Sequence, residues 1–180
     1  MRSEEYGTSP EPGTVRIERY LPGPVERIWA YLTEGEKRGK WLATGEMELR
    51  VGGRVEHHFL HADLSPEKVP PPKYAAAEAG HTMYGTVTRC EPPRLLAYTW
   101  GNEADDSEVT YELVPRGDEV LLVVTQRRLR GRAGMANVAA GWHTHLGLLL
   151  DHLEGRAARG FWSGHASAEA EYTRRFADQA

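Results

Sequence analysis

The side chains in this sequence most able to do chemistry are its 8 histidines, and most of them fall in two segments, 54–61 (RVEHHFLH) and 141–155 (GWHTHLGLLLDHLEG). Imidazole changes its charge near neutral pH and binds metal ions, so it serves both acid–base catalysis and metal ligation. The second segment belongs to a predicted helix at 132–154, in which each residue turns by about 100°. With angles measured from Val138, the apolar residues lie between about 0° and 80°, His145 at about −20° and His152 at about −40°. His143 lies at about 140°, so we expect it to face solvent and His145 to border the interior.

Metal ligation within this helix is excluded by its geometry. His143 and His145 point to different sides of the helix. His145 and His152 lie about 10 Å apart along the axis, whereas a zinc ion needs ring nitrogens about 2.1 Å away. The remaining arrangement is His61 with His81, which bracket a long loop and could meet in space. We therefore predict no metal site and no cofactor.

The elements that position these histidines follow from the spacing of apolar residues. Alternation predicts strands, and recurrence every three or four residues predicts helices. The predicted strands span residues 14–20, 46–51, 54–61, 83–90, 95–100, 108–115 and 119–128. The predicted helices span residues 24–33, 34–42, 132–154 and, after a break at 155–165, 167–177. The Pro- and Ala-rich segment 62–82 is too long for a hairpin turn, so it is expected to be a mobile or partly helical excursion.

Composition narrows the class of protein. A chain of 180 residues with 40% hydrophobic and 27% charged residues is typical of one globular domain. The net charge of −4 offers no general field for nucleic acid. The single Cys90 excludes an internal disulfide and a cysteine-based zinc site. The polar start of the chain lacks the apolar middle of a signal peptide, and no segment is long and apolar enough to span a bilayer, so we predict a cytoplasmic protein without membrane insertion.

The predicted motifs occur in an order that resembles a known family. The segments VERIWAYLTEGEKRGKWL, LRVGGRVEHHF, YGTVTRCEPPRLLAYTW, SEVTYELVP and GWHTHLGLLLDHLE are similar to bacterial proteins related to the activator of heat shock protein 90 ATPase. These proteins belong to the START-like, Bet v 1-like (SRPBCC) superfamily. The resemblance implies an α+β helix-grip fold, in which a curved antiparallel sheet of six to seven strands wraps a long C-terminal helix around an apolar cavity. Two short helices would follow the first strand.

We accordingly divide the chain into a flexible leader at 1–13, a START-like helix-grip domain at 14–155, and a C-terminal extension at 156–180. The short helix of the extension is expected to pack on the same domain, because its Tyr172 and Phe176 lie on one side. Self-association as a homodimer stays open, since the terminal segment also carries Phe161 and Trp162. Whether the loop at 62–82 forms an ordered lid is not decided by its sequence.

Alternation along each strand places one set of side chains on the concave face, if the strands keep the register of the family. Apolar walls with a few isolated polar groups are what a small-molecule pocket needs. The same apolar side chains could instead fill the core and leave no space. The residues predicted to line a cavity are His57, Phe59, Leu96, Tyr98, Trp100, Tyr111, Leu122, Val124, Gln126, Trp142, His145 and Leu149.

Three functions are compatible with this site. The first is binding of an apolar or amphipathic small molecule without catalysis. The second is an enzyme on the same scaffold, with His57 or His145 as proton carrier and Tyr98 or Tyr111 orienting a carbonyl or hydroxyl group. The third, suggested only by the name of the family, is a chaperone cofactor. Chaperone binding is not expected, because bacterial members generally stand alone and this chain lacks the additional amino-terminal domain of the eukaryotic activator.

Overall fold

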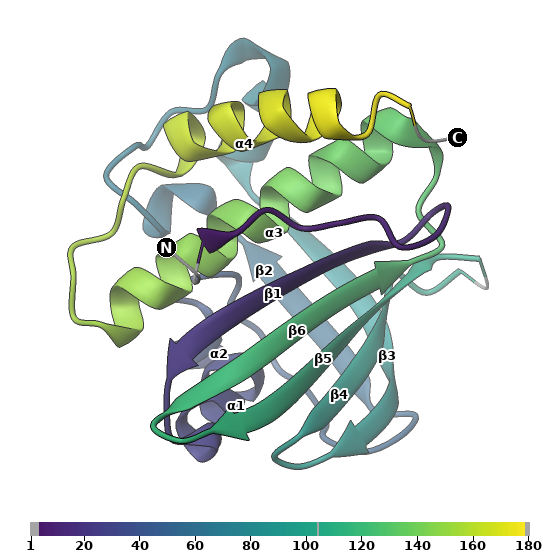
Figure 1. Ribbon diagram of the computed structural model, residues 1–180, viewed down its shortest axis with the longest axis vertical. Helices are drawn as coiled ribbons and strands as arrows, with labels where there is room; N and C mark the ends of the chain where they lie inside the picture. The colour runs from purple at the N-terminus through teal and green to yellow at the C-terminus, as the bar shows by residue number, and fades with distance from the viewer. Residues whose placement is uncertain (1–3, 104, 179–180) are drawn as a thin grey trace.

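The computed structural model describes residues 4–103 and 105–178 (Figure 1). Its strands are β1 (Val15–Pro22), β2 (Arg54–Phe59), β3 (His81–Glu91), β4 (Leu95–Trp100), β5 (Ser107–Arg116) and β6 (Glu119–Arg127). Its α-helices are α1 (Val25–Thr33), α2 (Gly35–Arg38), α3 (Gly131–Leu153) and α4 (Phe161–Arg175). This order of elements confirms the predicted α+β class with two short helices after the first strand.

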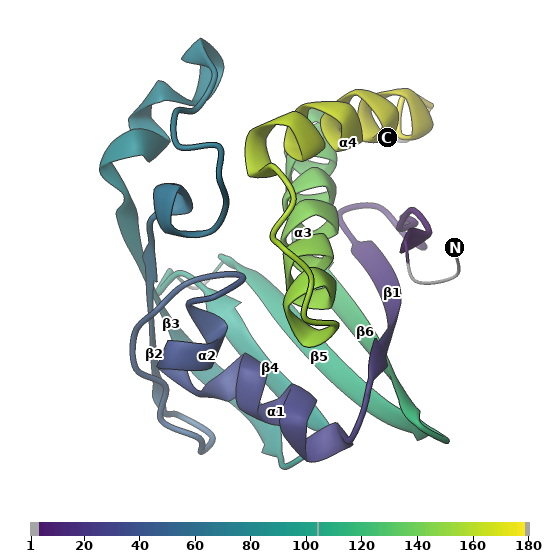
Figure 2. The ribbon, with the colours of Figure 1, turned by 90° about the vertical axis from the view of Figure 1, so that its left-hand side faces the viewer.

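The six strands form one antiparallel sheet in the order β1-β6-β5-β4-β3-β2. β3 pairs with both β2 and β4, and its register shifts between Val87 and Arg89, where the sheet bends. The bend helps to bring β1 and β2 to opposite sides of α3, as Figure 2 shows. The sheet therefore grips the long helix, as the resemblance implied.

A seventh strand at 46–51 was predicted, and this prediction is wrong. Only isolated bridges join this part of the chain to β2, between Thr44 and His58 and between Met47 and Val55. The apolar Leu49 and Val51 find no surface to pack on, since they are 43% and 66% exposed. Alternation without a face to bury does not hold a strand in register.

α3 occupies the concave side of the sheet, and α1 and α2 cover the lower end of the same side (Figure 2). α3 is buried on two sides. Leu146, Leu149 and Leu153 lie on its sheet side and are at most 5% exposed. The small Ala136 and Ala140 lie on the opposite side, where they allow α4 to pack closely, and Ala136 shares a second pocket with Thr173 of α4. The predicted helix at 132–154 is confirmed.

α4 lies across the outer side of α3 and begins six residues earlier than the sequence predicted, at Phe161 instead of 167 (Figure 1). Phe161 and Trp162 are 2% and 7% exposed, so the first turn is held by burial that periodicity does not reveal. The linker before α4 is clamped by Asp151 of α3, whose carboxylate accepts hydrogen bonds from Arg159 and Arg156. The aromatic side chains considered for self-association are thus buried within the chain.

The described part of the N-terminal segment, residues 4–13, lies against α3 and α4. Tyr6 stacks on His143 with ring centroids 4.6 Å apart, and the backbone N–H of Gly7 donates to the Tyr172 hydroxyl over 2.7 Å. The expectation that His143 faces solvent is wrong. Its Nδ1 accepts hydrogen bonds from Arg19 and Tyr172, because the N-terminal segment and α4 cover the outer side of α3.

The segment between β2 and β3 contains two 3₁₀ helices, His61–Asp63 and Pro72–Ala79. Within 60–80 the backbone hydrogen bonds outside the strands are local. Side chains tie the segment to α4: Ser65 accepts from the Phe161 N–H, and Glu67 accepts from Ser163. The segment is therefore partly helical, as predicted. Among the residues that the structure describes, no helix has the length and apolar character to cross a membrane.

Candidate functional site

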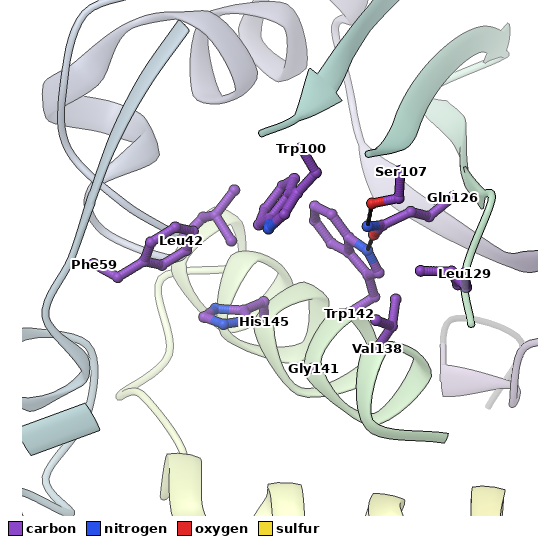
Figure 3. A pocket seen from close by; sticks show the side chains of 10 residues that line it. All are labelled: Leu42, Phe59, Trp100, Ser107, Gln126, Leu129, Val138, Gly141, Trp142 and His145. Atoms are coloured by element: carbon purple, nitrogen blue, oxygen red, sulfur yellow. Dashed lines mark hydrogen bonds between the residues drawn. The ribbon is translucent and has the colours of Figure 1, made fainter. Parts of the chain in front are cut away.

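A pocket of about 240 Å³ lies between α3 and the ends of the neighbouring strands (Figure 3). Its volume is below the range of about 300–1,000 Å³ that is typical of drug-sized sites. The residues that line it are Leu42, Phe59, Trp100, Ser107, Gln126, Leu129, Val138, Gly141, Trp142 and His145.

Three aromatic rings form the walls of the pocket. Phe59 ends β2, Trp100 ends β4 and Trp142 comes from the middle of α3. The centroid of the Trp100 ring lies 5.6 Å from that of Trp142 and 5.8 Å from that of Phe59. Rings at these distances pack edge-to-face or tilted. The walls of the pocket are therefore largely aromatic.

Gln126, at the end of β6, is held in one orientation. Its Oε1 accepts a hydrogen bond from Trp142 Nε1 over 2.7 Å, and its Nε2 donates to Ser107 Oγ over 2.8 Å. Indole N–H is only a donor, so the amide cannot be flipped. The hydroxyl of Ser107 accepts from Gln126, which leaves its own proton free to be donated elsewhere. Figure 3 shows this chain of hydrogen bonds at one side of the pocket.

His145 borders the pocket from α3 and is held as a neutral imidazole. Its Nδ1 lies 2.7 Å from the carbonyl oxygen of Trp41. A carbonyl oxygen only accepts, so Nδ1 carries the proton and Nε2 presents a lone pair. Burial, with a smaller contribution from the nearby His61, lowers the pKa of His145 to about 3. At neutral pH this residue therefore offers a hydrogen-bond acceptor and no charge.

None of the lining residues carries a charge at neutral pH. A charged ligand group would lose its hydration here without gaining an ion pair, which costs several kcal/mol or more. The lining therefore offers no countercharge to a charged group.

Three of the predicted site residues form a hydrogen-bonded chain behind the pocket. His57 Nδ1 donates to the Glu56 carbonyl, so its Nε2 accepts from the Tyr98 hydroxyl over 2.8 Å. The Tyr98 oxygen in turn accepts from Tyr111 over 2.7 Å. Burial lowers the pKa of His57 to about 3 and raises that of both phenols. Each of these three residues thus donates its proton to a neighbouring protein atom, and none of the three lines the pocket.

We expect Tyr98→Phe to destabilise the protein more than Tyr111→Phe. Removing the middle hydroxyl leaves His57 Nε2 and the Tyr111 hydroxyl both buried without a partner, at about 1–3 kcal/mol each. Removing the terminal hydroxyl breaks one hydrogen bond and costs about 1 kcal/mol. Urea denaturation of the two variants measures the difference. Equal losses of stability would contradict the place of Tyr98 in the middle of the hydrogen-bonded chain.

The structure brings five of the twelve predicted residues together at the pocket: Phe59, Trp100, Gln126, Trp142 and His145. The aliphatic residues of the prediction do not line the pocket. They lie in the core and are at most 2% exposed: Leu96, Leu122, Val124 and Leu149. Sequence reasoning missed half of the lining: Leu42, Ser107, Leu129, Val138 and Gly141. Strand pairing was the available signal for Ser107, which lies directly opposite Trp100.

Next to His145 lies a seam of aromatic and imidazole rings between the 60–80 segment and α4, which we call the imidazole seam: His61, His81, Phe161, Trp162 and His165. The His61 ring centroid lies 5.7 Å from that of His145 and 4.7 Å from that of Phe161. Burial, with smaller contributions from His81 and His165, lowers the pKa of His61 to about 4. His61 and His81 both stack on the ring of Phe59. In residues 4–103 and 105–178 no group of three ligands could hold a metal ion.

Acid should destabilise this protein well above the pH at which carboxylates titrate. His57 and His145 are 0% and 7% exposed, and their pKa values in the native state, about 3, lie below the usual value near 6.5. The unfolded chain therefore binds more protons between these values, and stability falls as the pH drops from about 6.5. Each imidazole removes about 1 kcal/mol per pH unit. Urea midpoints at pH 7 and pH 5 test this, and an unchanged midpoint would contradict it.

The strand order, the gripped α3 and a pocket at the sheet ends define a helix-grip domain. Residues 22–154 match the family model of the Activator of Hsp90 ATPase homolog 1-like proteins, so the chain belongs to this family. A protein from Bordetella parapertussis, with a solution NMR structure, is similar to this chain over almost its whole length. The two share 42% identity over 97% of this chain and 93% of that chain, with a TM-score of 0.80.

More distant solved structures share the fold. CalU16 from Micromonospora echinospora has 24% identity over 91% of this chain and 86% of its own, with a TM-score of 0.64. The conserved protein of unknown function EF2215 from Enterococcus faecalis has 22% identity over 94% of this chain and 89% of its own, with a TM-score of 0.65. A search of curated proteins gave no match.

Proposed function

We propose that this protein binds a small, neutral, largely apolar molecule in the pocket between the sheet and α3. The observation that carries the proposal is the lining itself. Three aromatic walls supply apolar area, and a few oriented polar groups, among them Gln126 and His145, supply orientation. Membership of a helix-grip family supports a binding role without naming a ligand.

The polar groups are placed in advance of binding, which supports the proposal further. Gln126 is fixed by Trp142 and Ser107, and His145 is fixed by the Trp41 carbonyl. Groups that are already ordered cost little conformational entropy when a ligand arrives. The pocket is therefore suited to bind without rearrangement of its walls.

An enzymatic role has less support from the geometry. Paired acid–base chemistry requires two groups that reach the same ligand. His145 borders the pocket, whereas His57 is tied into the buried chain with Tyr98 and Tyr111. We therefore favour binding over proton transfer at this site.

The proposal is tested by titrating a panel of neutral one- and two-ring compounds into protein labelled with ¹⁵N and following the indole N–H signals. Binding should move the signals of Trp100 and Trp142, which line the pocket. Trp41 serves as an internal control, since it is fully buried and its Nε1 donates to the Tyr31 carbonyl. If no compound moves the two pocket signals, the proposal fails.

A further inference from the structure

The polar atoms of the pocket divide into those that already have partners and those that do not. Gln126 and the indole of Trp142 satisfy each other. In residues 4–103 and 105–178, neither Trp100 Nε1 nor His145 Nε2 has a hydrogen-bond partner. Figure 3 shows the indole nitrogen of Trp100 on the side of its ring that faces the pocket. These two atoms, together with the proton of the Ser107 hydroxyl, are therefore available to a ligand.

Trp100 Nε1 and His145 Nε2 have opposite and fixed characters. Trp100 Nε1–H can only donate. His145 Nε2 can only accept, because its Nδ1 proton is committed to the Trp41 carbonyl. Neither atom changes its role near neutral pH, since the pKa of His145 is lowered to about 3. A ligand group that satisfies both must accept one hydrogen bond and donate another.

The structure assigns to this pocket a ring compound that carries a neutral hydroxyl group, with Trp100 and His145 as the residues that select it. This inference rests on the proposed function and names the ligand class. A hydroxyl group has both functions, because its oxygen accepts, as Trp100 requires, and its proton is donated, as His145 requires. A ketone or ether would leave His145 without a donor, and a hydrocarbon would leave both atoms unpaired. A carboxylate or an amine cation would enter a lining without a countercharge.

The closing experiment uses three probes of almost the same shape: 2-naphthol, 2-methoxynaphthalene and naphthalene. The first accepts and donates, the second only accepts, and the third does neither. Calorimetric or NMR titration of the wild type should give affinities in that order, with steps of about three- to tenfold for each hydrogen bond. Equal affinities for all three would overturn the assignment while leaving the proposed function in place. Absence of binding by all three would overturn both.

Trp100→Phe isolates the donor. The phenylalanine keeps an aromatic wall but lacks the N–H, so the preference for 2-methoxynaphthalene over naphthalene should disappear, while 2-naphthol keeps its bond to His145. Trp29→Phe makes the same chemical change on α1, outside the pocket, and should leave all three affinities unchanged. Preferences that persist in Trp100→Phe would overturn the role of Trp100. Because the readout is a ratio of affinities within one variant, a general loss of stability does not imitate it.

Discussion

Replacement of Gly141 by leucine abolishes ligand binding and leaves the fold intact. Gly141 lines the pocket from the middle of α3, and a Cβ added there meets no atom within 4 Å. A leucine side chain therefore extends into open space and occupies the volume that a ligand would use. We expect the affinity for any pocket ligand to fall more than about 100-fold, because a filled pocket buries no ligand surface.

The same change should make the protein more stable. Glycine within a helix costs about 0.5–1 kcal/mol relative to a good helix former. For a chain of this size the gain raises Tm by about 2–4 °C. Calorimetry and the naphthalene titrations measure both effects. This combination separates loss of the site from loss of the fold.

Gly134 provides the matched control. It lies in the first turn of α3, and an added Cβ there also meets nothing within 4 Å, but it does not line the pocket. Gly134→Leu should preserve ligand affinity. If Gly141→Leu binds as tightly as the wild type, or if both variants lose binding equally, the ligand does not occupy the described pocket.

Arg38→Met should cost about 3–5 kcal/mol of stability, a large loss for a single substitution. Arg38 is 1% exposed, and its guanidinium donates hydrogen bonds to four backbone carbonyls: Leu32, Thr33, Ala43 and Gly45. Burial lowers the pKa of Arg38. Methionine fills part of the volume but leaves these carbonyls without donors, and each buried orphan costs about 1–3 kcal/mol.

The consequence extends to the pocket. The turn that Arg38 holds together carries Trp41 and Leu42, which respectively orient His145 and line the pocket. We therefore expect Arg38→Met to weaken ligand binding as well as folding. Denaturation in urea and ligand titration at low temperature, where the variant remains folded, measure the two effects separately.

Lys37→Met is the control for this prediction. Lys37 is the neighbouring residue and makes an exposed ion pair with Glu34 at 2.6 Å. Such pairs contribute about 0–1 kcal/mol, so this variant should unfold almost like the wild type. A similar small loss for Arg38→Met would show that the four carbonyls find other donors.

Much of the fold was predictable because it depends on local periodicity. Alternation and helical spacing predicted the six observed strands and the long α3, and the order of motifs indicated the helix grip. The errors fall where periodicity is weak or has no packing behind it. The strand expected at 46–51 has no face to bury, and the first turn of α4 is held by Phe161 and Trp162, whose burial depends on the distant 60–80 segment.

Depth below the surface is what only the tertiary structure decided. Alternation places Tyr98 and Trp100 on the same face of β4, yet Tyr98 is fully buried in a chain with His57, while Trp100 borders the pocket. Likewise, helical angles give the direction of His143 but not the N-terminal segment that covers it. The sequence by itself determined which side of each element a residue occupies. Which of those residues meet a ligand was decided by the neighbours that chain folding brings from far away.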